Sequence, residues 1–380
     1  MLAVIADDLT GAAELGGIGL SYGLKVEISS KVNPSTKADL LVIATDTRSK
    51  TEVEAVAEME NVSRLVAQLN PQLIFKKVDS VLRGYVLAET SAQLEALKLG
   101  RALLVPANPA LGRTIENGSY LIDGKPIAET AFSGDPEFPT KSSDVIKLLR
   151  AGNQSVTVRK TNEVLPSEGI IVGEAATEAD LTRWAEFSGS GSLLAGASGF
   201  FRAILKQTEL SKPHTHTQSN ENLSGALLYV CGSAFAKSTH LVKEIFNSGG
   251  SVSYMSEEIN FRNNSADMDK WSDEICNLIR ENGKAIVAID SERQVFFNAL
   301  ELRSKMALVV KKVFDNTRID ELIIEGGSTA SSVLNELEID TLYPTEEYAT
   351  GVIRSKVAGR ELYITLKPGS YAWPNEVWAF

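Results

Sequence analysis

The sequence has few of the residues that build disulfides and metal centres. Its 380 residues include two cysteines and three histidines. Cys231 and Cys276 are far apart and match no metal or redox spacing, so we expect free thiols. His214 and His216 lie in a polar stretch without a third ligand, where solvated side chains are far more common than a metal site. We therefore expect no metal-ligating residues.

Long apolar runs and excess positive charge are also missing. No apolar stretch approaches the length of a membrane span, which argues against a membrane partner. The formal net charge of −11 argues against general nucleic-acid binding, although it leaves room for a small anionic ligand. The chain enters an apolar strand directly, without a basic and apolar leader, so we expect a cytoplasmic protein.

What the chain does contain is a regular alternation of strands and helices. Short apolar runs alternate with segments of helical apolar spacing on both sides of a polar stretch at residues 211–222. That stretch has the composition of a linker. We expect an α/β protein with two α/β domains of mainly parallel sheet, residues 1–210 and 223–380, and a ligand cleft between them.

The first strand and the loop after it carry the clearest signal in the first half. Leu2–Ala6 is a buried-strand candidate, Asp7 and Asp8 follow at once, and Thr10 can cap a helix. An acid pair at this position can simply cap the helix. Two adjacent carboxylates exceed what capping needs, so we favour a functional role.

Other polar side chains stand at or just after the ends of predicted strands. With the first acid pair the set is Asp7, Asp8, Arg48, Lys77, Asp79, Arg83, Asn108 and Arg113. The carboxyl ends of parallel strands share one edge of a sheet, so these side chains can converge. Arginine forks suit a carboxylate and acids suit hydroxyl groups, which together indicate a site for a small polyhydroxy acid. The alternative is a solvated rim on which each arginine pairs with a nearby acid.

The second half has one comparable signal, a glycine turn after a predicted strand. Gly326, Gly327, Ser328 and Thr329 follow the strand Leu322–Glu325. A glycine pair lets a phosphate approach the backbone at a helix N-terminus, and the hydroxyls add donors. The turn is neither a Walker loop nor a dinucleotide fingerprint. The alternative is a tight strand-to-helix turn without a ligand.

Together these segments resemble the four-carbon acid sugar kinase family, whose members phosphorylate threonate, erythronate or 3-oxo-tetronate with ATP. The matching segments, in order, are Ala6–Ala12, Thr45–Arg48, Lys76–Gly84, Pro106–Arg113, Gly232-Ser233 with Thr239, Gly326–Ala330 and Leu366–Gly369. The resemblance implies an N-terminal domain for the sugar acid, a C-terminal domain for ATP and transfer between them.

Carried over by position, the resemblance implies roles for individual residues. It implies substrate contacts at Asp8, Arg48, Asp79, Ser80 and Arg83, and nucleotide contacts at Ser233, Gly326, Gly327, Ser328, Thr329 and Gly369. Asp7, Lys77 and Arg113 join the substrate set by their position, and we expect Asp8, Asp79 and Arg83 to be catalytic. Phosphoryl transfer also needs a proton acceptor, for which Asp7, Asp8 and Asp79 all qualify.

Three departures from the family pattern keep a catalytically inactive binding protein open as an alternative. Val81 replaces a threonine, Ala234-Phe235 replaces Cys-Ser, and Tyr371-Ala372 replaces Phe-Gly. We expect an ATP- and Mg²⁺-dependent kinase of a four-carbon sugar acid, possible as a homodimer. The alternatives are an NAD(P)-dependent oxidoreductase of a hydroxy acid and a catalytically inactive sugar-acid binding protein.

Overall fold

Two compact units make up the chain in the computed structural model. The structure describes residues 1–135, 138–152, 154–189, 191–208, 223–232, 236–256, 259, 265–290, 298–378 and 380. The first unit comprises Met1–Val26 and Ser30–His214, and the second comprises Glu27–Ser29 and Thr215–Phe380. The expected linker, residues 211–222, lies outside the described residues.

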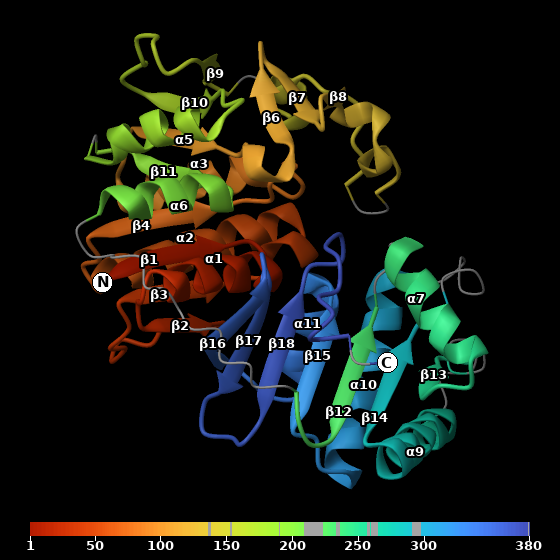
Figure 1. Ribbon diagram of the computed structural model, residues 1–380. Coiled ribbons are helices and arrows are strands. Elements are labelled where there is room, and N and C mark those ends of the chain that lie inside the picture. The colour runs from red at the N-terminus through yellow and green to blue at the C-terminus, as the bar shows by residue number, and fades with distance from the viewer. Residues whose placement is uncertain are drawn as a thin grey trace. The chain divides into compact units, whose positions relative to one another are not determined.

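A parallel sheet forms the centre of the first unit (Figure 1). Its strands, in spatial order, are β3 (Leu40–Ala44), β1 (Leu2–Ala6), β4 (Leu73–Lys77), β11 (Leu193–Gly196), β5 (Arg101–Val105), β10 (Gly169–Gly173) and β9 (Val156–Arg159). The described pairings between these strands are parallel. The first strand lies between β3 and β4, so the chain changes direction across the sheet at β1. Ligands of open parallel sheets bind at such a point.

Helices cover both faces of this sheet because its strands are apolar on both sides. The helices of the unit are α1 (Leu9–Ser21), α2 (Glu52–Gln68), α3 (Val86–Leu97), α4 (Val145–Leu148), α5 (Glu178–Ala185) and α6 (Ser198–Gln207). Ala3 and Ile5 of β1 share a core cluster with Met59 and Val62 of α2. On the other face, α1 contacts β3 and packs beside α6. Alternate residues of each strand therefore serve opposite layers.

A small antiparallel sheet completes the first unit. It consists of β6 (Arg113–Glu116), β7 (Ser119–Ile122) and β8 (Lys125–Pro126). Its first turn is Asn117-Gly118, with both residues at positive φ, as expected for a tight hairpin. Short 3₁₀ turns stand at Thr47–Ser49, Pro109–Leu111, Ile127–Glu129, Ala131–Gly134 and Glu186–Gly189.

The second unit contains a mixed sheet with a parallel part. Its strands, in spatial order, are β13 (Val252–Tyr254), β14 (Lys284–Ala288), β12 (Leu227–Cys231), β15 (Glu321–Glu325), β18 (Tyr363–Lys367), β17 (Val352–Val357) and β16 (Thr341–Ala349). The last two are antiparallel to their neighbours. Ile28 and Ser29, from β2 (Val26–Ser29), pair with β16, which explains why Glu27–Ser29 group with this unit.

The helices of the second unit are α7 (Ala236–Asn247), α9 (Ser265–Asn282), α10 (Ala299–Asn316) and α11 (Gly327–Glu336). Helix α10 packs against both α9 and α11. Val242 of α7 joins a core cluster with Tyr229 and Val377. This arrangement confirms the expected fold class of two α/β domains. In the part of the chain that the structure describes, no helix is both long and apolar enough to cross a membrane.

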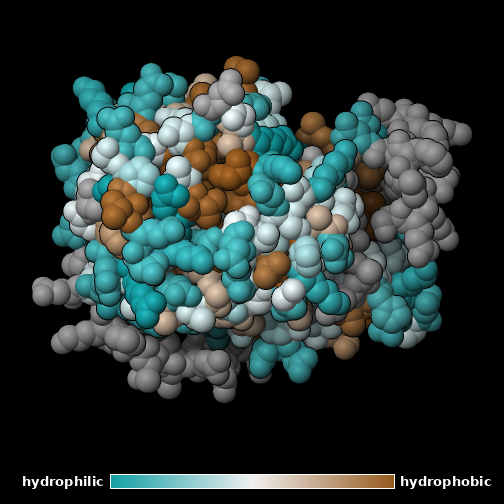
Figure 2. Space-filling model, turned by 90° about the horizontal axis from the view of Figure 1, so that it is seen from above, coloured by the Kyte–Doolittle hydropathy of each residue, from teal (hydrophilic) through white to brown (hydrophobic). Residues whose placement is uncertain are grey.

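Apolar side chains of the strands are buried almost completely. Val4, Ile5 and Ala6 are each 0% exposed, as are Ile323 and Ile324 of β15. On the face in Figure 2, hydrophilic residues cover most of the surface and hydrophobic residues form smaller areas among them. This is the distribution expected when the sheets and one side of each helix form the core.

Candidate functional site

The ends of three neighbouring strands bring the first group of candidate residues together. Ala6, the last residue of β1, pairs with Ala44 of β3 on one side and with Lys77 of β4 on the other. The loops that follow these strands therefore leave the sheet next to one another. Asp7 and Asp8 follow β1, and Asp79 comes two residues after Lys77.

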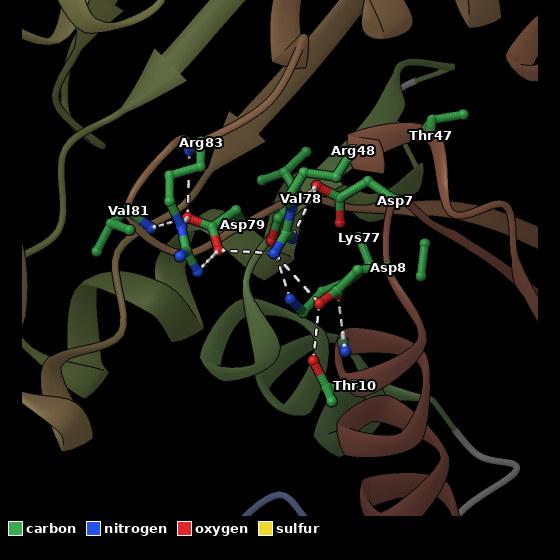
Figure 3. Close-up of polar contacts among 12 residues, drawn as sticks. Asp7, Asp8, Thr10, Thr47, Arg48, Lys77, Val78, Asp79, Val81 and Arg83 are labelled. Atoms are coloured by element: carbon green, nitrogen blue, oxygen red, sulfur yellow. Dashed lines mark hydrogen bonds and ion pairs between the residues drawn. The ribbon is translucent and has the colours of Figure 1, made fainter. Parts of the chain in front are cut away.

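Arg48 occupies the centre of this group (Figure 3). Its Nη2 lies 2.9 Å from Asp7 Oδ2, and its Nη1 lies 3.2 Å from Asp8 Oδ2 and 3.4 Å from Asp79 Oδ2. The guanidinium side chain is 12% exposed. One cation therefore neutralises part of the charge of three buried carboxylates. These side chains are buried, so they do not form the solvated rim of the alternative interpretation. The pairing of an arginine with nearby acids is nevertheless what that interpretation expected.

Asp8 is the N-cap of helix α1. Its Oδ1 accepts a hydrogen bond from Gly11 N at 2.8 Å, and its Oδ2 accepts one from the Thr10 hydroxyl at 2.7 Å. Burial acts to raise the pKa of Asp8, but Arg48, Lys77 and the Thr10 hydrogen bond outweigh it and hold the pKa below its ordinary value. A Cβ at Gly11 would stand 2.5 Å from Asp8 Oδ1, so this position needs a glycine. Capping accounts for one acid of the pair.

Asp7 is the acid that capping does not explain. It is 3% exposed, and the guanidinium of Arg48 binds only its Oδ2. Asp7 Oδ1 is buried and has no hydrogen-bond partner among the described residues. Burial, helped by the negative charge of Asp8, raises the pKa of Asp7 from 3.8 to about 6 against the opposing effect of Arg48. Asp7 thus combines an unused acceptor atom with a pKa close to neutrality.

Asp79 organises the loop after β4. Its Oδ1 accepts hydrogen bonds from Val81 N at 3.0 Å and Arg83 N at 3.2 Å, while Arg83 Nη2 lies 2.8 Å from its Oδ2. Burial acts to raise the pKa of Asp79, but Arg83 and Arg48 outweigh it and hold the pKa far below its ordinary value. Leu82 in this loop has φ 63°, an uncommon conformation for a leucine that this tight turn imposes.

The remaining candidates of the first unit lie around this loop. Lys77 Nζ donates to the Val78 carbonyl at 2.9 Å and lies 3.9 Å from Glu14 Oε2. Arg113 Nη1 donates to Ser80 Oγ, so these two candidates meet. Asn108 instead donates from Nδ2 to Ser198 Oγ at 2.9 Å. No contact joins Asn108 to Arg48 among the described residues.

Two partners of the site were missed from the sequence. Asp135 Oδ2 accepts from Arg83 Nη1 at 3.1 Å, across 52 residues of sequence. Tyr120 donates its hydroxyl to the Ser80 carbonyl. In the sequence Asp135 stands between Gly134 and Pro136, a pattern typical of turns that gives no indication of a contact with Arg83.

The second unit brings its candidates to the ends of β15 and β18. Gly326, directly after β15, has φ 93° and forms the N-cap of α11 without a side chain. Its N–H donates to the Lys367 carbonyl at 2.9 Å, so the glycine turn meets the residue before Pro368 and Gly369. The first N–H groups of a helix have no partners inside the helix, which makes this end of α11 suitable for a phosphate.

A buried ion pair joins the ends of β15 and β18 next to this turn. Glu325 and Lys367 are each 0% exposed, and Lys367 Nζ lies 2.8 Å from Glu325 Oε1. Ser238 of α7 also donates its hydroxyl to Glu325. A Cβ at Gly232 would stand 2.4 Å from Thr329 Oγ1, so the loop after β12 packs closely on the start of α11. Ser233 and the departure Ala234-Phe235 lie outside the described residues.

No group of three or more histidine, cysteine, aspartate or glutamate side chains could hold a metal ion within the described ranges. The three aspartates around Arg48 are drawn together by a cation of the protein itself.

Two family models match the two halves of the chain. A sequence model of a sugar-binding N-terminal domain matches residues 2–204, and one of a nucleotide-binding C-terminal domain matches residues 228–371. A D-threonate kinase of Salmonella typhimurium is 27% identical over 88% of this chain and 86% of its own length. A 3-oxo-tetronate kinase of Actinobacillus succinogenes is 24% identical over 98% of this chain and 96% of its own.

Solved structures show the same fold. A Salmonella typhimurium protein superposes with a TM-score of 0.76 at 18% identity, over 99% of this chain and 97% of that protein. A Haemophilus influenzae protein gives a TM-score of 0.69 at 19% identity, over 99% and 98% of the two chains. The two family models together span most of the sequence, and the first alone covers more than half of it. The chain therefore belongs to the four-carbon acid sugar kinase family.

Proposed function

We propose that this protein transfers the γ-phosphoryl group of ATP to a hydroxyl of a four-carbon sugar acid. The observation that carries the proposal is the joint match of a sugar-binding and a nucleotide-binding domain, each at a unit whose strand ends hold fitting polar groups. Relatives that match most of this chain are kinases of D-threonate and 3-oxo-tetronate. Neither relative is an oxidoreductase, and the kinase is the better supported of the two enzyme functions.

In this proposal the first unit binds the sugar acid. Asp8, Arg48 and Lys77 set the charge of the site, while Asp79 holds the loop that presents Ser80 and Arg83. Arg113 contacts the Ser80 hydroxyl from the small antiparallel sheet. Hydroxyl groups of a substrate would find carboxylate acceptors here, and its carboxylate would find guanidinium donors.

Asp7 is the proton acceptor in this proposal. The substrate hydroxyl oxygen forms a bond to the γ-phosphorus, the bond from that phosphorus to the β-phosphate oxygen breaks, and ADP leaves. The hydroxyl proton passes to Asp7 Oδ1, the oxygen that Arg48 does not bind. A pKa of about 6 leaves Asp7 mostly ionised at neutral pH and still basic enough to accept the proton. Asp8 and Asp79 are weaker bases because their pKa values are lowered.

The second unit binds ATP in this proposal. The turn formed by Gly326, Gly327, Ser328 and Thr329 offers backbone N–H groups and hydroxyls to the phosphates, and Gly369 adjoins it through the Lys367–Gly326 hydrogen bond. Ser233 keeps its expected nucleotide role. Mg²⁺ enters as part of the MgATP substrate, where it neutralises charge on the β- and γ-phosphates.

The direct test is detection of the transferred group. Purified protein, ATP, Mg²⁺ and D-threonate or D-erythronate are incubated, and phosphorus NMR follows ADP and a new phosphate monoester. We expect the monoester to appear together with ADP. ADP without a monoester would indicate hydrolysis alone, and neither product with any four-carbon acid would favour the binding-protein alternative.

Three further expectations belong to the proposal. The sugar acid is the partner, and a homodimer stays a prediction that light scattering can check. The cytoplasmic location follows from the need for ATP. The domain boundaries at residues 210 and 223 also stay predictions, which limited proteolysis between the two units can test.

A further inference from the structure

A pocket of about 300 Å³ adjoins the loop of the first unit that carries Arg83. The loop Val81–Gly84 forms one wall, and Phe138–Ser142 with Lys147 and Arg150 forms the other. These two segments are far apart in the sequence, and the pocket lies entirely within the first unit. None of the roles proposed above uses the second wall.

The charge of this pocket is strongly one-sided. Its lining includes Arg83, Lys141, Lys147 and Arg150, and among the described residues that line it none is acidic. Arg83 is offset by Asp79 and Asp135. The other three cations form no ion pair with any carboxylate in the part of the chain that the structure describes. A concave surface lined by one sign of charge concentrates counter-ions, so this pocket attracts a small anion.

Two residues join the pocket to the acid cluster. Arg83 lines the pocket and also binds Asp79 through Nε at 3.2 Å and Nη2 at 2.8 Å. Gly84 lines the pocket too, and a Cβ built on it would stand 3.8 Å from Asp7 Oδ2 and 3.6 Å from Arg48 Cγ. Gly84 therefore lines the pocket and also stands next to Asp7 and Arg48.

The remaining polar groups of the pocket are hydroxyls. Thr140 and Ser142 stand on the same wall as the lysines. Cations next to hydroxyl groups match a polyhydroxy carboxylate, whose carboxylate needs donors and whose hydroxyls both donate and accept. Lys147 and Arg150 are exposed, so their side chains can adjust to an incoming anion.

We propose that this pocket is the subsite for the carboxylate end of the sugar acid, with Lys141, Lys147 and Arg150 selecting acids over neutral sugars. The proposal rests on the proposed function and adds a specificity determinant to it. Arg83 is the residue that lines the pocket and also holds the Asp79 loop, with Nε and Nη2 on Asp79 and Nη1 on Asp135.

The test is the double variant Lys147→Gln with Arg150→Gln. Both side chains are exposed, so the fold should persist, which circular dichroism checks. We expect the KM for the best tetronate to rise about tenfold or more, because charge-assisted contacts are lost. The kcat and the KM for ATP should stay unchanged. Lys206→Gln, which removes an exposed cation from α6 of the same unit, is the control and should leave all three values unchanged. An unchanged tetronate KM in the double variant would overturn the subsite.

A binding measurement tests the subsite separately from phosphoryl transfer. If the wild type phosphorylates no tetronate, calorimetric titration with D-threonate, D-erythronate and inorganic phosphate still measures anion binding. Binding by the wild type that weakens about tenfold in the double variant would retain an anion subsite. Equal binding by both proteins, or none by the wild type, would overturn it. Binding of phosphate but of neither tetronate would also overturn it, because the pocket would then take a different anion.

Discussion

Arg48 binds Asp7 on one side only: its Nε and Nη2 donate to the same oxygen, Oδ2, at 3.3 Å and 2.9 Å. The other oxygen, Oδ1, is buried and has no partner among the described residues. A carboxylate held in this way is fixed in orientation and keeps one acceptor atom free. The adjacent Asp8 has both oxygens engaged, by Gly11, Thr10 and Arg48.

The pH dependence of catalysis should report Asp7. We expect kcat/KM to rise with pH through an apparent pKa near 6, because Asp7 accepts a proton only when it is ionised. Asp7→Asn should remove this limb and lower kcat by a factor of roughly 10²–10⁴. A pH–rate series on both proteins measures this. Retention of the limb in the variant would assign it to another group.

The pH dependence of stability should distinguish the two adjacent acids. Asp7 holds its proton more tightly in the folded chain, so its contribution to the free energy of unfolding falls as pH rises from 3.8 to about 6. The pKa of Asp8 is lowered, so its stabilising contribution is present above 3.8 and lost as pH falls below that value.

Urea unfolding of Asp7→Asn and Asp8→Asn between pH 3 and 8 measures this difference. Relative to wild type, Asp7→Asn should gain stability as pH rises, and Asp8→Asn should lose it. Parallel curves for the two variants would contradict the assignment of different environments to neighbouring residues.

Arg48 should be needed for the fold of the first unit as well as for its site. Arg48→Gln would leave three buried carboxylates without their shared cation, and removing one partner of a buried pair costs roughly 3–5 kcal/mol. Arg64→Gln is the control, since Arg64 pairs with Glu60 on the exposed face of α2 and such pairs contribute about 0–1 kcal/mol. Urea unfolding measures the free energy of unfolding of both variants. Equal losses would show that Arg48 contributes no more than one partner of a surface ion pair.

Gly326 should be required for ATP affinity, beyond any effect on stability. Gly326→Ala places a Cβ at φ 93° and changes the turn that receives phosphate, so we expect a weaker affinity for ATP and an unchanged affinity for the sugar acid. Gly249→Ala is the matched control: Gly249 has φ 79° in the same unit, and nothing lies within 4 Å of its Cβ position. Nucleotide titration compares them. Similar loss of ATP affinity in both would point to general strain.

Much of the fold could be predicted because its local signals are strong. The apolar spacing of residues 51–69 predicts a helix, and the structure has α2 there, with Thr51 and Glu54 forming a capping box at its start. The antiparallel pair β16 and β17 was missed. Two buried positions of β16 hold Pro344 and Glu346, so the sequence shows no apolar alternation there, and the pairing with β17 shifts register between them.

That these side chains lie together could be predicted from the sequence, but their individual environments could not. Position after a strand was enough to bring Asp7, Asp8 and Asp79 together, because parallel strands end at one edge. Which acid caps α1 and which keeps a free oxygen depends on side-chain orientation, which the sequence does not encode locally. The contact of Arg83 with Asp135 depends on a loop far along the chain, for which no spacing rule exists.

We propose that the protein phosphorylates a four-carbon acid and that the acid group is required. The most direct measurement is an ADP-release assay with MgATP over D- and L-threonate, D- and L-erythronate and their 3-oxo forms, with neutral tetroses as controls. We predict turnover with at least one of the acids and at most a background rate with the neutral sugars. Turnover on neutral tetroses with none on the acids would contradict the proposed sugar-acid kinase activity.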